Sequence, residues 1–270
     1  MTIITNIGEL VGIVPEGVLR KRGAEMDEVG SLKDAYLTIE GERISGFGNM
    51  SECPAAGPQD ELIDAEGGMV MPAFCDSHTH ICYAGTRERE FIDKINGLSY
   101  EEIAARGGGI LNSADLLHRT SEEELYSQTM ARVREMIAKG TGAIEIKSGY
   151  GLTTEDELKM LRVIRRVKSE SPATIKATFL GAHAVGRAFK GRQNEYVNLV
   201  CEEMIPTVAA EGLAEYVDVF CDEGFFTVSE TERILTAGER HGLIPKIHAN
   251  ELACSGGVQV AVKHNALSVD

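Results

Sequence analysis

Two histidines separated by one residue, His78 and His80, are the strongest chemical signal in the chain. They follow the apolar residues 70–76, which predict a buried strand. Side chains two residues apart on an extended segment project to the same side, so both imidazoles can reach one metal ion. Two surface histidines in a loop are the alternative. Cys75 and Cys82 flank the pair and offer a structural zinc site as a competing interpretation, but they lack the C-x₂-C spacing typical of such sites.

A third histidine, His248, ends another predicted strand and could complete a three-histidine metal site. Glu251 follows three residues later, where a carboxylate can handle protons beside the metal. A buried histidine with one hydrogen bond, next to a helix-capping carboxylate, is the alternative interpretation. The His78 and His80 pair favours the metal site, so we expect all three histidines to share one coordination sphere.

The segments that carry these residues alternate between short apolar runs and amphipathic helices, which predicts βαβ units and a parallel sheet. The predicted strands cover residues 73–75, 143–146, 175–180, 217–220, 244–247 and 266–269. The predicted helices cover residues 121–139, 154–169, 194–210 and 229–241. Capping boxes of the form S/T-x-x-E begin the first two helices, at Ser121 with Glu124 and at Thr154 with Glu157.

Reactive side chains lie at or just past the C-terminal ends of these predicted strands. They are His78, His80, Lys147, His183, Asp222 and His248. A (β/α)₈ TIM barrel places its chemistry at this edge, whereas a doubly wound sheet concentrates its ligands at one switch point. We therefore predict an α/β fold of the TIM-barrel type in residues 67–270. A complete barrel takes about 250 residues. Only 199 residues follow Met71, so we expect about six strands and an incomplete barrel.

Residues 1–66 predict a small β-rich domain, expected to be part of a β-sandwich. An apolar, β-prone stretch at residues 2–13 is interrupted by Gly8. Residues 36–47 predict a hairpin around Glu40-Gly41-Glu42.

Composition narrows the classes of partner. The chain of 270 residues carries 42 acidic and 27 basic residues, and the net charge of −15 opposes binding to nucleic acid or to an anionic membrane. No apolar run approaches the roughly 20 residues of a membrane helix. The first residues do not resemble a signal peptide, and the six scattered cysteines are typical of reduced thiols. We expect a cytoplasmic protein with a small-molecule partner; a homodimer stays open.

Residues 70–80 (VMPAFCDSHTH) resemble the first-strand signature of the amidohydrolase superfamily. More specifically, the chain is similar to the imidazolonepropionases, hydrolases that open the imidazolone ring during histidine degradation. The resemblance runs over essentially the whole chain. Further matching stretches are 145–152 (EIKSGYGL), 178–184 (TFLGAHA), 218–221 (DVFC) and 246–251 (KIHANE).

The resemblance implies a role for each matching residue. The metal ligands would be His78, His80 and His248, holding one zinc or iron ion. Substrate would be bound by Arg87, which holds the propionate carboxylate, and by Tyr150 and His183, which contact the imidazolone ring and its side chain. Glu251 would position or activate the attacking water. The implied reaction is hydrolysis of 4-imidazolone-5-propanoate to N-formimidoyl-L-glutamate by a metal-activated water.

The family pattern continues past Asp270 with a sixth-strand histidine and an eighth-strand aspartate that also serves the metal. We therefore expect residues 1–270 to correspond to the front part of such an enzyme and to be inactive alone. Two alternatives stay open. One is another cyclic-amide or amidine hydrolase of the superfamily, which need not have Arg87, Tyr150 and His183. The other is an inactive fragment or binding module that lacks the last metal ligand.

Lys147 raises a further hypothesis, a carbamylated lysine that bridges two metal ions. It lies on the second predicted strand, whereas superfamily members with two metals use the fourth, so one metal is expected. His118, His241 and His264 fall on or beside predicted helices and are expected to be surface or packing residues.

Overall fold

The computed structural model describes residues 1–98, 102 and 109–270. The chain separates into two compact units, Met1–Ala73 and Phe74–Asp270. The predicted boundary follows residue 66, but Met69 and Val70 pair with the first strand and so belong to the first unit. Among the described residues, no helix is both long enough and apolar enough to cross a lipid bilayer.

The first unit is built on one five-stranded sheet. Its strand order is β3-β2-β1-β4, and β5 also pairs with β1. The pairs β1–β2 and β2–β3 are antiparallel, whereas β4 and β5 run parallel to β1. Part of a β-sandwich is predicted for this unit, and its described residues form this single sheet. The elements are β1 (Thr2–Val11), η1 (Gly23–Asp27), β2 (Ser31–Glu40), β3 (Arg43–Asn49), η2 (Met50–Glu52), β4 (Glu61–Asp64) and β5 (Met69–Val70).

The predicted hairpin forms, with Glu40 of β2 opposite Arg43 of β3. The predicted interruption at Gly8 is wrong, because β1 continues through this residue. A Cβ atom at position 8 would lie 2.1 Å from the carbonyl oxygen of Gly67. Gly8 therefore permits a close backbone approach inside the strand instead of ending it.

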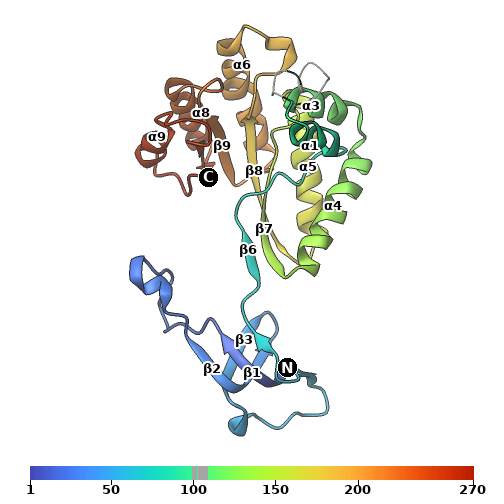
Figure 1. Cartoon of the computed structure of the whole chain (residues 1–270), viewed down its shortest axis with the longest axis vertical. Coiled ribbons are helices and arrows are strands. Elements are labelled where there is room, and N and C mark those ends of the chain that lie inside the picture. The colour runs from blue at the N-terminus through green and yellow to red at the C-terminus, as the bar shows by residue number, and fades with distance from the viewer. Residues whose placement is uncertain (99–101, 103–108) are drawn as a thin grey trace. The chain divides into compact units, whose positions relative to one another are not determined.

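The second unit is a parallel half-barrel whose helices lie between successive strands (Figure 1). Its strand order is β10-β9-β8-β7-β6, and β11 also pairs with β9. Every pair is parallel, as the alternation of strands and helices predicts. The strands are β6 (Phe74–Asp76), β7 (Thr141–Lys147), β8 (Thr174–Ala182), β9 (Tyr216–Cys221), β10 (Ile244–Pro245) and β11 (His248–Ala249).

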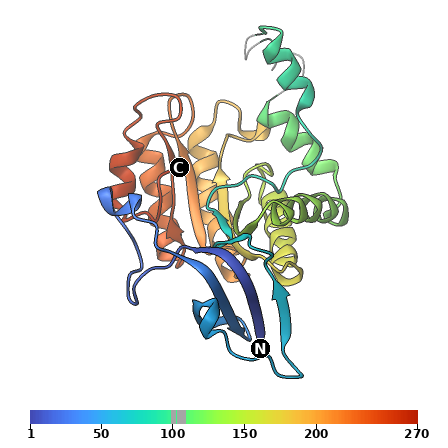
Figure 2. The ribbon, with the colours of Figure 1, turned by 60° about the horizontal axis from the view of Figure 1, so that its bottom comes forward.

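The sixth predicted strand is reduced to a single bridge, in which Val269 pairs in parallel with Ile247. The backbone N–H of Asp270 donates to the Ile247 carbonyl at 2.9 Å, so the last residues continue the parallel order beyond the fifth predicted strand. Figure 2 shows the chain end beside the strands of this unit. The strand predicted over residues 70–76 is also shorter and more exposed than expected: β6 covers three residues, and Phe74 is 58% exposed.

The four predicted helices form, and the described part of the chain contains further helices that the sequence pattern did not predict. The described elements are α1 (Glu88–Ile95), α3 (Ile110–Arg119), α4 (Glu122–Ala138), α5 (Thr154–Glu170), η3 (Arg187–Phe189), α6 (Gln193–Leu199), the π-helical η4 (Val200–Met204), α7 (Ile205–Ala210), α8 (Val228–Arg240) and α9 (Gly257–Lys263). The helix predicted over residues 194–210 is thus continuous in space but divided by the π-helical turn η4.

Capping decides where two of these helices begin. Ser121 caps α4 by accepting a hydrogen bond from the backbone N–H of Glu124, as predicted. The predicted cap of α5 is wrong: Thr153, not Thr154, is the N-cap, and its side chain accepts from Asp156. Glu157 takes no part in this cap and is buried instead.

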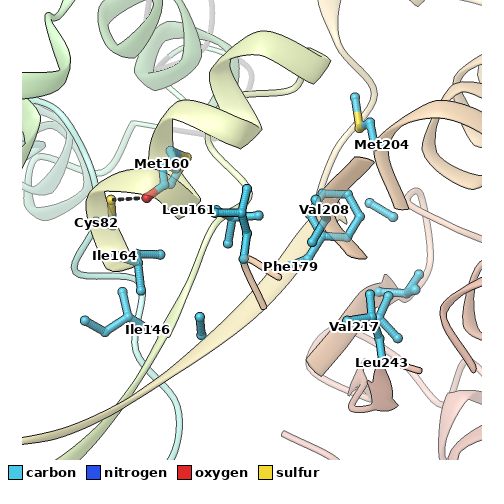
Figure 3. Close-up of a cluster of buried hydrophobic side chains, with 14 of the residues drawn as sticks. Cys82, Ile146, Met160, Leu161, Ile164, Phe179, Met204, Val208, Val217 and Leu243 are labelled. Atoms are coloured by element: carbon cyan, nitrogen blue, oxygen red, sulfur yellow. Dashed lines mark hydrogen bonds between the residues drawn. The ribbon is translucent and has the colours of Figure 1, made fainter. Parts of the chain in front are cut away.

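Buried side chains of the helices and strands fill the layer between them (Figure 3). Leu161 and Ile164 of α5 are fully buried, together with Ile146 of β7 and Phe179 of β8. Burying each side chain of this size stabilises the fold by about 1.5–3 kcal/mol. This core fixes α5 against the sheet, and with it the loop between β7 and α5 that enters the site described next.

Candidate metal centre

Three histidines meet at the C-terminal edge of the parallel sheet. The Nε2 atoms of His78 and His80 lie 3.1 Å apart, and those of His80 and His248 lie 3.2 Å apart. One ligand atom from each of the three histidines lies within 4.8 Å of the others. The structure therefore brings together the three residues that the sequence pattern predicts as metal ligands.

Local geometry explains why the histidine pair faces one way. Thr79, between the two, points to the opposite side, where it is buried and its Oγ1 donates to the Glu145 carbonyl at 2.6 Å. The backbone N–H of Lys147 donates to the Thr79 carbonyl at 3.0 Å. This alternation of an extended segment holds both imidazoles on the open side of β7.

The spacing of the three nitrogens fits a metal ion better than it fits hydrogen bonds. Two nitrogens that each lie about 2.0–2.1 Å from a tetrahedral ion are about 3.3 Å apart. The Nε2 of His80 is close to two other ring nitrogens, and a single N–H cannot serve both. Burial, together with the neighbouring His183 and His248, lowers the pKa of His80 to about 2. His80 is therefore a neutral imidazole, the form that binds metals.

Carboxylates orient two of these rings from behind. The Nδ1 of His248 lies 2.9 Å from Asp218 Oδ2, and the Nδ1 of His78 lies 3.2 Å from Asp270 Oδ2. An acceptor at Nδ1 fixes the proton there and leaves Nε2 free as a ligand, the usual outer-sphere arrangement of metal-binding histidines. Asp218 was not predicted as a site residue. Its signal was present, because a charged residue inside the apolar run 217–220 is unusual unless it is paired.

Lys147 lies beneath the histidines and is fully buried. Its Nζ is 2.8 Å from Asp218 Oδ2, 2.9 Å from Glu145 Oε1 and 3.3 Å from Asp270 Oδ2. Burial alone would lower the pKa of this amine, but the carboxylates outweigh it and raise the pKa. Carbamylation needs a neutral amine, so these contacts disfavour the bridging-lysine hypothesis and favour a structural ammonium that joins the outer-sphere carboxylates.

Tyr150 and His183 lie next to His80, and Arg87 lies next to Tyr150. The rings of His80 and His183 stack with centroids 5.1 Å apart, and the Tyr150 ring lies 5.4 Å from that of His183. The His183 Nδ1 lies 3.0 Å from the Gly149 carbonyl, which makes Nδ1 the donor and leaves Nε2 free. Burial, together with the neighbouring His248, lowers the pKa of His183 to about 4, so His183 is neutral as well.

A cavity of about 380 Å³ opens beside these rings, lined by His80, Ile81, Tyr83, Ala84, Arg87, Ser113 and Tyr150. The Arg87 guanidinium carbon lies 5.8 Å from the Tyr150 ring centroid, and its Nε donates to Ser113 Oγ at 2.9 Å. Its described carboxylate neighbour, Glu90, is 3.8 Å away, which is long for a salt bridge. The Arg87 side chain is 42% exposed, and its guanidinium can bind an anion in this cavity.

Glu251 is placed differently from the other predicted residues. Its side chain is exposed, and its described hydrogen bond runs from its backbone N–H to Asp222 Oδ2 at 2.8 Å. Asp222 also accepts backbone N–H groups of Glu223, Leu252 and Ala253. Asp222 therefore shapes the loop that carries Glu251, and the predicted proton-handling role of Glu251 stays a prediction.

The remaining histidines and cysteines lie outside the group. His118 pairs with Asp156 at 2.8 Å and His264 with Glu239 at 3.0 Å, while His241 is exposed at the end of α8. Cys82 is buried in the core, where burial raises its pKa to about 12. Cys75 is exposed. Neither cysteine joins the histidine group in the described part of the chain, which disfavours the structural cysteine–histidine zinc site.

Comparison with known proteins gives close sequence relatives. The chain is 53% identical over 268 residues to an imidazolonepropionase of Christiangramia forsetii, covering 99% of this chain and 65% of the relative. It is 53% identical over 270 residues to one of Flavobacterium johnsoniae, covering 100% and 66%. A third, from Alkaliphilus oremlandii, is 39% identical over 269 residues, covering 99% and 64%. No family model matches the chain.

Solved structures show the fold. A 5-methylcytosine deaminase from Klebsiella pneumoniae, liganded with phosphonocytosine, has a TM-score of 0.65 at 15% identity and covers 97% of this chain and 55% of its own. Ochratoxinase of A. niger has a TM-score of 0.60 at 16% identity, covering 99% and 59%. The chain thus has the amidohydrolase-type barrel fold over its length, and it spans 65–66% of the first three curated relatives. By sequence, the chain is similar to the imidazolonepropionases over nearly all of its own length.

Proposed function

We propose that this chain supplies the metal site and the substrate cavity of a hydrolase that opens 4-imidazolone-5-propanoate to N-formimidoyl-L-glutamate. The observation that carries the proposal is the convergence of the Nε2 atoms of three histidines beside a cavity that is lined by the cationic side chain of Arg87. The three are His78, His80 and His248. The sequence relatives support the choice of substrate. Because the chain spans about two thirds of their length, the activity of the whole enzyme is part of the proposal.

His78, His80 and His248 would hold one metal ion, zinc or iron. When bound, such an ion lowers the pKa of a water towards roughly 7 and polarises the carbonyl that is attacked. In the reaction, water adds to the carbonyl carbon of the ring and the C–N bond breaks, so the ring nitrogen must receive a proton. The proposed groups for proton transfer and ring contact are Glu251, His183 and Tyr150.

Arg87 would bind the propionate carboxylate of the substrate. Its planar guanidinium projects into the same cavity as Tyr150, and a bidentate pair with a carboxylate is both directional and strong. The acidic balance of the protein makes such a local cation necessary for an anionic substrate. The same balance supports a small-molecule partner over nucleic acid, and the free cysteines support a cytoplasmic location.

The test is hydrolysis of imidazolone propionate by the complete enzyme that contains this chain, measured as loss of the substrate's ultraviolet absorbance after zinc or iron is added. Arg87→Met should raise KM roughly 10- to 150-fold, the loss of one charge-assisted hydrogen-bonded pair, while metal content stays unchanged. The matched control is an imidazolone that lacks the carboxylate, for which the variant and the parent should have similar KM values. Equal KM values for the charged substrate would show that Arg87 does not bind it.

A further inference from the structure

Glu157, in the first turn of α5, is a fully buried carboxylate whose described partners lie in the preceding loop. Its Oε1 accepts backbone N–H groups of Gly151 at 2.7 Å and Leu152 at 3.0 Å. Its Oε2 accepts the N–H of Gly149 at 3.0 Å. Both carboxylate oxygens thus accept hydrogen bonds from the loop that connects β7 with α5 and carries Tyr150.

The loop needs such a partner, because its backbone is unusual. Leu152 has a positive φ of 56°, which non-glycine residues rarely adopt, and Gly149 has a φ of 109°. A Cβ atom at Gly151 would lie 2.4 Å from the backbone nitrogen of Glu157, so the loop packs directly on the start of the helix. Strained backbone of this kind persists only where surrounding contacts determine it.

The same loop also holds His183. The Gly149 carbonyl accepts from His183 Nδ1 at 3.0 Å, while the Gly149 N–H donates to Glu157. Through its N–H and its carbonyl, Gly149 therefore links the buried carboxylate of Glu157 to the His183 ring, which stacks on His80. Tyr150 is the next residue, and its side chain lines the cavity.

We propose that Glu157 is a positioning residue, which holds residues 149–152 so that Tyr150 faces the cavity and His183 stacks on His80 of the histidine group. It touches neither the cavity nor the candidate metal ligands, so it would act only through the loop. The assignment of Tyr150 and His183 to substrate binding rests on the proposed function, whereas the hold on the loop does not.

The variant that tests this is Glu157→Gln, which keeps the shape of the side chain. An amide nitrogen in place of one carboxylate oxygen presents a donor to a backbone donor, so at least one of the three loop bonds is lost. The matched control is Asp156→Asn, on the same turn of α5. Asp156 is also buried, but its partners are Thr153, His118 and Lys159, and none belongs to residues 149–152.

Two measurements separate loop positioning from general stability. Amide hydrogen exchange at Gly149, Gly151 and Leu152 should accelerate roughly tenfold or more in Glu157→Gln and stay within about twofold in Asp156→Asn. In turnover by the complete enzyme, Glu157→Gln should raise KM severalfold at unchanged metal content. This rise should be smaller in a Tyr150→Ala background if Glu157 acts through the loop.

The outcomes are distinct. If loop exchange is unchanged in Glu157→Gln, or rises equally in Asp156→Asn, the positioning role is overturned. If exchange changes as expected but the complete enzyme does not hydrolyse imidazolone propionate, Glu157 still positions the loop and the proposed function fails. Should Glu157→Gln not fold, Ser148→Ala removes a milder contact to the same carboxylate. It should give the same exchange pattern with a smaller amplitude, and no change in exchange would again overturn the role.

Discussion

Removing the carboxylate behind His248 should weaken metal binding without touching a ligand atom. Asp218 Oδ2 lies 2.9 Å from His248 Nδ1 and 2.8 Å from Lys147 Nζ, and both Asp218 and Lys147 are buried. In Asp218→Asn the His248 ring keeps its place but loses the charge that fixes its tautomer and raises its basicity. Outer-sphere changes of this type cost 10- to 100-fold in metal affinity, which corresponds to about 1.4–2.7 kcal/mol.

The same substitution should also lower the free energy of unfolding of the metal-free protein. Breaking a buried ion pair costs about 3–5 kcal/mol when one charge is left unpaired. Lys147 still has Glu145 at 2.9 Å and Asp270 at 3.3 Å, so a loss of about 3 kcal/mol or less is expected from that range. Asp218 ordinarily stays ionised, because His248 and Lys147 outweigh the effect of burial and lower its pKa.

The assay is zinc affinity of chelator-stripped protein at pH 7, measured in competition with a chromophoric chelator, with urea unfolding in parallel. Asp222→Asn is the matched control, since Asp222 is also a buried aspartate, just past the end of β9, and its described side-chain partners are backbone N–H groups. The control should lose stability and keep zinc affinity within about twofold. If Asp218→Asn keeps the zinc affinity of the parent, or if both variants lose it equally, the outer-sphere reasoning is refuted.

Two further predictions concern protonation. In the folded protein the pKa of His80 is lowered to about 2 and that of His183 to about 4. Below pH 6.5 the unfolded chain therefore binds more protons than the folded protein. The free energy of unfolding, measured in the presence of chelator, should fall as the pH drops from 7 to 5, by up to about 1.4 kcal/mol per pH unit for each group. Urea unfolding across this range checks it; a flat profile would show that the rings are not held neutral. Cys82, whose pKa is raised to about 12 by burial, should resist a thiol reagent at pH 8 while exposed Cys75 reacts at once, and equal labelling rates in the folded protein would contradict the buried position.

Much of the second unit follows from patterns that are local in the sequence. The alternation of strands and helices is confirmed, because each element has its own periodicity and its own end signals. The nearness of His78, His80 and His248 follows from topology, since parallel strands end at the same edge. The cap at Ser121 was also correct, whereas Thr153 and Thr154 both stand three residues before an acidic residue, and spacing alone could not decide between them.

What could not be predicted depends on contacts between distant segments. Asp218 pairs with Lys147, 71 positions away, and no spacing rule links the two. Glu157 fits the pattern of a capping residue, yet in the tertiary fold it is buried and accepts hydrogen bonds from the loop before the helix. The pairing of β5 with β1 joins residues about 60 positions apart, so the sequence pattern does not reveal that Met69 and Val70 pair with the first strand.

Because Thr79 is hydrogen-bonded to β7, the side that His78 and His80 face depends on whether their segment is displaced by an odd or an even number of residues. Side chains of an extended segment alternate with a period of two, so a slip of this segment by one position against β7 would turn both imidazoles toward the side that Thr79 now occupies and leave a hydroxyl at the open side. Because His78 and His80 are two positions apart, a slip by one residue turns both of them away together. Insertion or deletion of a single residue next to this segment is therefore far more damaging to the ligand set than a conservative replacement in it, whereas a change by two residues restores the facing of the side chains.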